Sequence, residues 1–485
     1  MNKKKIISIC FAFAALLIIL ILPTPESLPI AGQRALAILA FAVIMWVTEA
    51  VSYPVSSAMI VGLIAILIGL SPTIDDPSAI FGSKNALKMA LGGFSSSAVG
   101  LVGGALFIAM AMEITGLHKR IALYIMSKVG SKTSALVMGT ILVSIVLAFF
   151  VPSATARAGA LVPILMGIVA AFGLKHNSKL AALLIITAVQ SISIWNIGIK
   201  TAAAQNMVAL GFMETTLDYH ISWGKWFIYA APWSLLMSAV LYFVMTRLIK
   251  PEVSELGNGK EVINEKLRQL GKITGKEARL IVISVLLLLF WATEGIIHPF
   301  DSTTVTLIAV AIMLIPGIGV YSWKEVEKKI PWGTLVVFAI GISLGTVLLN
   351  TQGAQWLSST TLEAVGLTSM PFVFIIMVLS LFNILIHLGF ASATSLASAF
   401  IPIVIALVAA MEPTTFNGPG LVLIQQFVIS FGFLLPVSAP QNMLAYGTGA
   451  FTSSDLLKAG LPITIIGYIL IIIFSLTYWQ WVGLL

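Results

Sequence analysis

The sequence predicts an all-α polytopic membrane protein with about 11 transmembrane helices and two re-entrant helical hairpins, arranged as two inverted-topology repeats. The first observation is composition: 59% of the 485 residues are hydrophobic and only 9% are charged, unlike soluble globular proteins. The second is a short polar string that occurs twice, and the third is the placement of charges. Alternating ten-residue strands, which a membrane β-barrel requires, do not occur.

Residues 1–30 are predicted to form an N-terminal transmembrane helix. Three consecutive lysines at residues 3–5 precede an apolar run at residues 6–22. A cleaved signal peptide is the alternative, but no clear small-x-small cleavage site follows the run. Because positive charges stay on the inner side of a membrane, we expect the N-terminus to be cytoplasmic.

Two halves of the chain repeat the same strings in the same order. The string W-x-T-E at residues 46–49 returns at residues 291–294, and Q-N-M at residues 205–207 returns at residues 441–443. The spacing falls slowly from 245 to 236 residues, which indicates a duplication with small changes in loops. The predicted division is a first repeat at 31–248, a cytoplasmic connector at 249–279 with a short surface helix, and a second repeat at 280–485.

Each span of the first repeat follows from an apolar run and the charges that flank it. After the first helix, residues 31–50 return to the inside, residues 54–70 leave and residues 97–115 return. Residues 117–129 are basic and amphipathic and are expected to lie along the inner surface. Residues 134–173 are too long for one span and are interrupted, so we expect two half-helices in a hairpin that opens to the inside. A broken span at 180–212 and a helix at 223–248 complete the repeat.

The second repeat begins on the inner side, whereas its counterpart begins on the outer side, so the repeats are inverted. Its hairpin, residues 370–411, has no Lys or Arg in its flanks and is expected to open to the outside. The same count places the C-terminus outside the cell. We therefore expect a multi-pass protein of the plasma membrane, with the lipid bilayer as its surroundings.

The string that occurs twice is Ser-Ala-Thr, followed by a proline ten residues after its serine. Each copy breaks an apolar stretch and exposes a helix N-terminus, whose free N–H groups favour an anion. Two such tips from inverted hairpins are expected to meet, and their hydroxyls suit a dicarboxylate. The alternative is that these residues only cap helices or pack as small side chains. The predicted substrate-binding residues here are Ser153, Ala154, Thr155, Ser392, Ala393 and Thr394.

A second pair of breaks is predicted at residues 196–206 and 435–442. Prolines and polar residues prevent a regular helix there, so free carbonyls and side-chain amides are expected to line the same cavity. A structural kink without a binding role is the alternative. The candidates in these segments are Thr201, Asn206, Ser438, Pro440 and Asn442.

Three ionisable residues fall where the depth of the membrane makes a charge costly: Arg157, Lys200 and His387. A buried cation needs a partner, so each is expected to face water, a substrate carboxylate or backbone carbonyls. We interpret them as candidate fixed charges, although a lone histidine in a helix is commonly a packing residue. We interpret the glutamates of the repeated W-x-T-E string as scaffold residues that fix contacts between helices or belong to a dimer interface.

Enzymatic and metal functions find no support in the sequence. Neither a hydrolase nucleophile motif, a phosphate-binding loop nor a Cys/His metal cluster occurs. The single Cys10 excludes a disulfide framework and is expected to be buried. The net charge of +8 follows the loops and does not indicate nucleic acid. No cofactor and no bound metal are expected.

These motifs resemble those of the divalent anion/sodium symporter (DASS) family, and the resemblance covers nearly the whole chain after the first helix. It implies a homodimer in which a transport domain moves past a scaffold domain like an elevator. It also implies di- and tricarboxylate substrates such as succinate, malate, fumarate, 2-oxoglutarate and citrate, or sulfate in some branches. Ser153, Thr155, Ser392 and Thr394 match the substrate-binding tips, and residues 203–206 and 439–442 match the broken helices.

One departure decides the branch. Sodium-coupled members carry Ser-Asn-Thr at both tips, whereas Ala154 and Ala393 stand here and offer no side-chain oxygen to a hard cation. The sequence after Thr155, with Arg157, resembles the sodium-independent exchangers. We therefore expect a dicarboxylate exchanger with a substrate and a counter-substrate. A sodium-coupled di- or tricarboxylate symporter is the first alternative, and a channel or an intramembrane enzyme comes after it.

Overall fold

The computed structural model describes residues 3–130, 132–255, 259–365, 370–410 and 417–485. Within them, every regular element is a helix, and the only strand-like pairings are isolated bridges. Nine of the described helices are long and apolar enough to cross a membrane. The protein is thus an all-helical polytopic membrane protein, as predicted.

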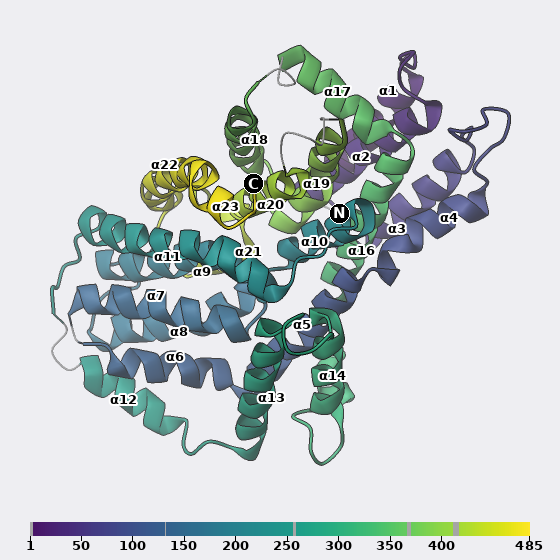
Figure 1. Cartoon of the computed structure of the whole chain (residues 1–485). Coiled ribbons are helices and arrows are strands. Elements are labelled where there is room, and N and C mark those ends of the chain that lie inside the picture. The colour runs from purple at the N-terminus through teal and green to yellow at the C-terminus, as the bar shows by residue number, and fades with distance from the viewer. Residues whose placement is uncertain (1–2, 131, 256–258, 366–369, 411–416) are drawn as a thin grey trace.

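The first half of the chain carries a long series of helices (Figure 1). They are α1 (Lys3–Ile21), α2 (Ile30–Thr48), α3 (Tyr53–Leu63), α4 (Ser83–Leu91), α5 (Ser97–Thr115), α6 (Leu117–Lys128), α7 (Thr133–Phe150), α8 (Ala154–Ala171), α9 (Lys179–Gly198), α10 (Ala204–Leu217) and α11 (Trp223–Leu248). Short π and 3₁₀ turns extend α3 and α4, and η3 (Lys200–Ala202) separates α9 from α10.

The second half repeats this order after the connector helix α12 (Gly259–Gln269). Its elements are α13 (Gly275–Ala292), α14 (Ser302–Leu314), α15 (Trp323–Val326), α16 (Trp332–Asn350), α17 (Gly353–Val365), α18 (Phe372–His387), α19 (Ala393–Ala410), α20 (Gly418–Ile429), η5 (Pro436–Ser438), α21 (Pro440–Tyr446), α22 (Ser453–Leu476) and α23 (Tyr478–Trp481). Each repeated string falls on the same element of its half: the end of α2 or α13, the start of α8 or α19, and the start of α10 or α21.

The two halves interlock around their hairpins. Helix α9 is buried along its whole length and packs against α7, α8 and α11, which Figure 1 shows as one stack. Helix α8 also packs against α21 of the other half, and α19 packs against α10 in the corresponding exchange. Each hairpin therefore contacts the broken helix of both halves, which places the two tips at one location.

Local sequence explains where the hairpin helices begin. The Ser153 hydroxyl accepts a hydrogen bond from the Ala156 N–H at 3.2 Å, and the Ser392 hydroxyl accepts one from the Ser395 N–H at 3.3 Å. Serine is a favoured N-cap because its oxygen satisfies an amide that the helix leaves unpaired. The helices begin at Ala154 and Ala393.

Several sequence predictions are confirmed and others need correction. Residues 3–21 are helical, and the connector holds its predicted short helix as α12. The arms of the first hairpin are 18 residues each, about 27 Å at 1.5 Å per residue, so they are longer than half-helices. Residue 411, the predicted end of the second hairpin, lies outside the described residues. Cys10 is exposed rather than buried, because α1 packs only along one side.

Candidate functional site

A cavity of about 650 Å³ lies where the hairpin tips and the two breaks meet. Both Ser-Ala-Thr strings line it, together with segments of each break and residues from α3, α5, α6 and the α15–α16 region. Nine of the residues singled out from the sequence contribute to its wall: Ser153, Ala154, Thr155, Ser392, Ala393, Thr394, Ser438, Pro440 and His387. The structure therefore brings together two strings that stand 239 residues apart.

The wall between the tips offers hydrogen-bond donors rather than apolar surface alone. Ser153 and Ser392 give their oxygen to a helix amide, and each hydroxyl also carries a proton that it can donate. The N-termini of α8 and α19 add partial positive charge at the same place. At the middle positions, Ala154 and Ala393 present only methyl groups to the cavity.

Five of the predicted residues do not line this cavity, and three of them hold the breaks in shape. The Asn206 amide donates to the carbonyls of Asn196 at 2.7 Å and Ile199 at 3.2 Å. The Asn442 amide donates to Gly432 at 2.7 Å and Leu435 at 3.3 Å, which are the equivalent positions.

Thr201 is also structural, because its hydroxyl accepts from the indole N–H of Trp223 at 3.3 Å. These three side chains pair with backbone carbonyls and a ring N–H around the breaks.

Arg157 also lies outside the cavity wall, behind it. Its side chain is fully buried, and its Nη2 donates to the Asn196 side-chain oxygen and to the Ala202 carbonyl at 3.0 Å. Asn196 lines the cavity, so one amide side chain separates the guanidinium from the solute space. Within the described residues Arg157 has no ion pair, and its Nε and Nη1 have no hydrogen-bond partner.

His387 makes the equivalent contact in the other half. Its Nε2 lies 3.1 Å from the Ser438 carbonyl, and Ser438 stands 236 residues after Ala202, the same spacing that relates the two breaks. The contact requires a proton on Nε2, which a neutral imidazole supplies as well as an imidazolium does. The same carbonyl of each break is thus bound by a nitrogen side chain from the adjacent hairpin.

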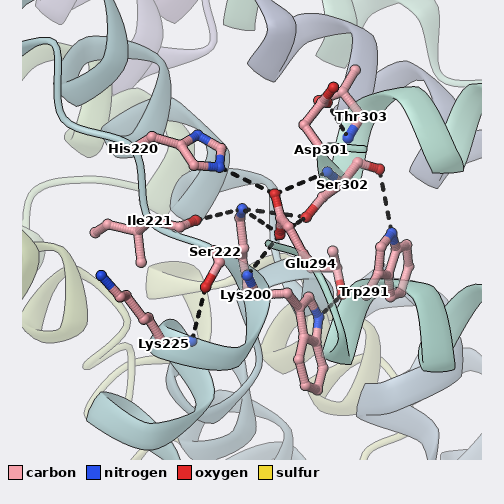
Figure 2. Close-up of polar contacts among 12 residues, drawn as sticks. Lys200, His220, Ile221, Ser222, Lys225, Trp291, Glu294, Asp301, Ser302 and Thr303 are labelled. Atoms are coloured by element: carbon pink, nitrogen blue, oxygen red, sulfur yellow. Dashed lines mark hydrogen bonds and ion pairs between the residues drawn. The ribbon is translucent and has the colours of Figure 1, made fainter. Parts of the chain in front are cut away.

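Lys200 does not fit the role of a free fixed charge. Its ammonium group donates to the Ile221 carbonyl at 2.7 Å and lies 3.9 Å from Glu294 Oε2, and Lys200 is not among the residues that line the cavity. Figure 2 shows it among polar residues at the helix ends. Glu294 belongs to the repeated W-x-T-E string, so one of the two scaffold glutamates compensates this buried lysine.

The sequence interpretation missed several residues at the cavity wall. Lys119 and Lys329 are exposed and line the cavity from α6 and from the loop before α16, with Glu113 and Tyr53 beside them. Nothing in the sequence places the two lysines together, because they stand 210 residues apart.

Two glutamines of the repeated Q-N-M string also line the cavity. The Gln205 amide donates to the Ser430 hydroxyl at 3.2 Å, and the Gln441 amide donates to the Ser193 hydroxyl at 3.0 Å. The carbonyl oxygen of each glutamine remains available as an acceptor. The repetition of the string was the available signal for these two residues.

Comparison with known proteins gives a match over almost the whole chain. A family model described as the sodium:sulfate symporter transmembrane region matches residues 3–485. A membrane protein from Cupriavidus necator is 49% identical over 472 residues, which cover 97% of this chain and 92% of that protein.

Two relatives with stated activities are more distant. The citrate/succinate antiporter of Escherichia coli K12 is 26% identical over 476 residues, 95% of each chain. The sodium-dependent dicarboxylate transporter SdcS of Staphylococcus saprophyticus is 25% identical over 498 residues, 97% of this chain and 91% of that one. Their nearly equal identities do not distinguish exchange from sodium coupling.

A solved structure shares the fold. The crystal structure of the Alcanivorax borkumensis YdaH transporter, whose title reports an unusual topology, superimposes with a TM-score of 0.58 at 13% sequence identity. The match covers 90% of this chain and 98% of that one. At this identity the likeness concerns the path of the chain and the packing of its helices.

Proposed function

Because the chain belongs to the sodium:sulfate symporter family, the DASS family that its motifs resemble, we propose that it exchanges dicarboxylates across the plasma membrane without sodium. The protein is a multi-pass membrane transporter and not an enzyme. The proposed substrates are succinate, malate, fumarate and 2-oxoglutarate, one serving as substrate and another as counter-substrate. The relatives named for citrate/succinate and for dicarboxylates support this class.

The observation that carries the proposal is the pair of occupied carbonyls in the two breaks. Arg157 donates to Ala202, and His387 contacts the equivalent Ser438. A hard cation needs several oxygen ligands, but here a nitrogen side chain already uses one carbonyl of each break. Ala154 and Ala393 add no further oxygen, so the protein provides its own positive charge instead of binding sodium.

A fixed charge also explains why transport would be an exchange. A sodium ion can leave with the solute, so the empty carrier returns without net charge in the membrane. Arg157 cannot leave, and a substrate carboxylate near the tips would balance it. Returning empty would then carry an unbalanced charge through a low-dielectric region, at a cost of about 2.5–3.5 kcal/mol. That barrier makes the return depend on a counter-substrate.

The larger architecture belongs to the same proposal. We propose two inverted repeats, residues 31–248 and 280–485, that form a scaffold and a moving transport domain, in a homodimer with a cytoplasmic N-terminus and an extracellular C-terminus. The repeated order of elements and the exchanged packing of α8 with α21 and α19 with α10 support it.

The test is flux into proteoliposomes without sodium. Labelled succinate should enter vesicles preloaded with dicarboxylate at least about ten times faster than empty vesicles, the factor that 1.4 kcal/mol provides. Sulfate serves as the comparison anion. Rapid uptake into empty vesicles, driven by a sodium gradient, would establish the symporter instead.

A further inference from the structure

A polar cluster lies next to the first break, at the ends of α10 and α13 and the starts of α11 and α14 (Figure 2). Its members are Lys200, Glu214, His220, Glu294 and Ser302. They come from η3, from the last turn of α10, from the loop before α11, from the loop after α13 and from the start of α14. We call this set the Glu294 cluster.

Glu294 is the centre of the cluster. Its carboxylate accepts the Trp223 N–H at 2.9 Å, the Ser302 N–H at 3.1 Å and the Ser302 hydroxyl at 2.6 Å. His220 Nε2 lies 3.1 Å from Oε1, and Lys200 Nζ lies 3.9 Å from Oε2. The side chain is 5% exposed, so these contacts replace the water that a carboxylate would otherwise bind.

His220 lies between two carboxylates, and this geometry requires a proton on each ring nitrogen. Nδ1 is 3.2 Å from Glu214 Oε1, while Nε2 is 3.1 Å from Glu294 Oε1. A neutral imidazole donates from one nitrogen and carries a lone pair on the other. That lone pair would face a carboxylate oxygen, so only the imidazolium makes both contacts favourable.

The charge balance of the cluster also favours a protonated His220. With His220 protonated, two positive groups, Lys200 and His220, face the two carboxylates of Glu214 and Glu294. Without that proton, a net negative charge stays in a largely buried site, which is costly. Asp301 lines a small adjoining cavity of about 180 Å³, and its carboxylate already accepts the amides of Thr303 and Thr304. The His220 side chain is 52% exposed, so protons can reach it from water.

The cluster connects directly to the wall of the solute cavity. Lys200 opens the 3₁₀ turn η3, and Ala203, Ala204 and Gln205, which follow that turn, line the cavity. The Lys200 carbonyl also accepts from the Asn206 amide at 3.2 Å. A change in the position of Lys200 therefore moves a segment that shapes the solute site.

We propose that His220 is a proton-binding site that positions the first break through Glu294 and Lys200, so that protonation favours the cavity seen here. His220 acts as a positioning residue and does not contact the solute. The inference rests on the proposed exchange function for its effect on transport, and on the cluster alone for its effect on stability.

The direction of the pH dependence follows from the contacts. Hydrogen bonds to Glu214 and Glu294 raise the pKa of His220 to about 9, although burial opposes the shift. Burial would raise the pKa of Glu294, but the His220 hydrogen bond, the Lys200 charge and the Ser302 hydroxyl lower it to about 2. Because the pKa of His220 is raised, its contribution is complete below about 6.5 and is lost as the pH rises through about 9.

The experiment measures dicarboxylate exchange and thermal stability of the full-length protein between pH 6.5 and pH 10, with the same pH on both sides of the vesicles. Dicarboxylates are fully ionised over this range, so the solute adds no titration. In the unchanged protein, dicarboxylate exchange and thermal stability should both fall as the pH rises, with a midpoint near pH 9. E214Q removes one of the two carboxylate charges beside His220 and should lower that midpoint by about one unit. H220Q should remove the alkaline step, and the exposed control H176Q should leave it unchanged.

The proposal is overturned if H220Q and the unchanged protein share one pH profile, or if E214Q leaves the midpoint where it was. If H220Q does not fold, E214Q alone decides, because a purely structural loss would lower activity without moving the midpoint. A protein that exchanges no dicarboxylate at any pH would contradict the proposed function, and the pH profile of thermal stability would still decide on the proton site.

Discussion

At the scale of single residues, Arg157 is the unusual feature of this molecule. A fully buried guanidinium with no ion pair among the described residues is rare, because burial removes the water that stabilises the charge. Its counterpart at the 239-residue spacing is Leu396, so the duplication did not produce a second copy. A buried cation without an ion pair behind the cavity wall is the pattern expected of a charge that a bound anion completes.

Replacing Arg157 should make solute efflux less dependent on a counter-substrate. In R157Q the empty carrier no longer carries an unbalanced charge, so net efflux into solute-free buffer should rise relative to exchange by at least about tenfold. R157K keeps the charge and should preserve the ratio. The measurement compares efflux with and without external dicarboxylate, and R247Q, at an exposed position at the end of α11, is the control. An unchanged ratio in R157Q would contradict the fixed-charge explanation.

The two lysines at the cavity wall should govern capture of the anion. Exposed cations raise the local concentration of a dianion, and salt screens this effect. The double variant K119Q/K329Q should therefore raise the KM for succinate about three- to tenfold at low ionic strength, with kcat nearly unchanged.

Two features of that experiment separate capture from damage. The difference should shrink at high salt, and K128Q, at the other end of α6, should have no effect. A fall in kcat with no change in KM would mean that the lysines act on a step after binding.

The sequence identified the residues at the tips but could not distinguish Lys200 from Arg157. Both are cations in apolar surroundings, and depth alone marks each as functional. The difference arises from a tertiary contact: Glu294, 94 residues away, lies beside Lys200, whereas Arg157 meets only carbonyls and an amide. Charge partners between distant helices are not visible in one sequence.

At the scale of elements, the two breaks are built by one repeated device. Each asparagine that follows a break donates to carbonyls ten and seven residues earlier. The Ile199 and Leu435 carbonyls also accept the backbone amides of Ala202 and Ser438, so each asparagine side chain joins the end of one helix to the 3₁₀ turn that follows it. The breaks are therefore fixed structures, and the polar residues in them divide into those that build the break and those that face the cavity.

Removing either asparagine should lower the stability of the folded protein, and not only its affinity for the solute. N206A and N442A each leave buried carbonyls unpaired, which costs about 1–3 kcal/mol. The melting temperature should fall in both variants and by similar amounts, because the contacts are equivalent. N85A, whose amide caps an exposed turn of α4, is the matched control. Unchanged stability with lost transport would mean that the asparagines bind the solute after all.

Both the order of the elements and their approximate bounds were predictable from the sequence. Apolar runs and polar interruptions located the hairpins, the broken spans and the connector helix, because a membrane leaves few ways to satisfy the backbone. The arms of the first hairpin match the predicted range 134–173, and α8 continues through Pro163, a residue that usually ends a helix. Tight packing against α9 outweighs that local preference.

At the scale of the whole molecule, the arrangement in the membrane depends on charge asymmetry. The proposed orientation puts the connector inside, and the loop with Asp76 and the C-terminal turn outside. In a C10A background, cysteines at Asp76 and Gly483 should react with an impermeant maleimide in right-side-out vesicles. A cysteine at Lys272 should react only after permeabilisation. Labelling of residues 76 and 483 on opposite sides would contradict the inverted repeats.

The unequal partners of the two equivalent carbonyls have a consequence for the solute itself. Ala202 receives a guanidinium, which is charged at every physiological pH, while Ser438 receives an imidazole. The two halves of the site therefore keep the same backbone arrangement but differ in their charges. Symmetric succinate fits in either direction, but malate, whose two ends differ, would bind with a preferred polarity. Stereoselectivity between its mirror images would then come from a duplication that diverged at two pairs of positions, Arg157 with Leu396 and Ala148 with His387.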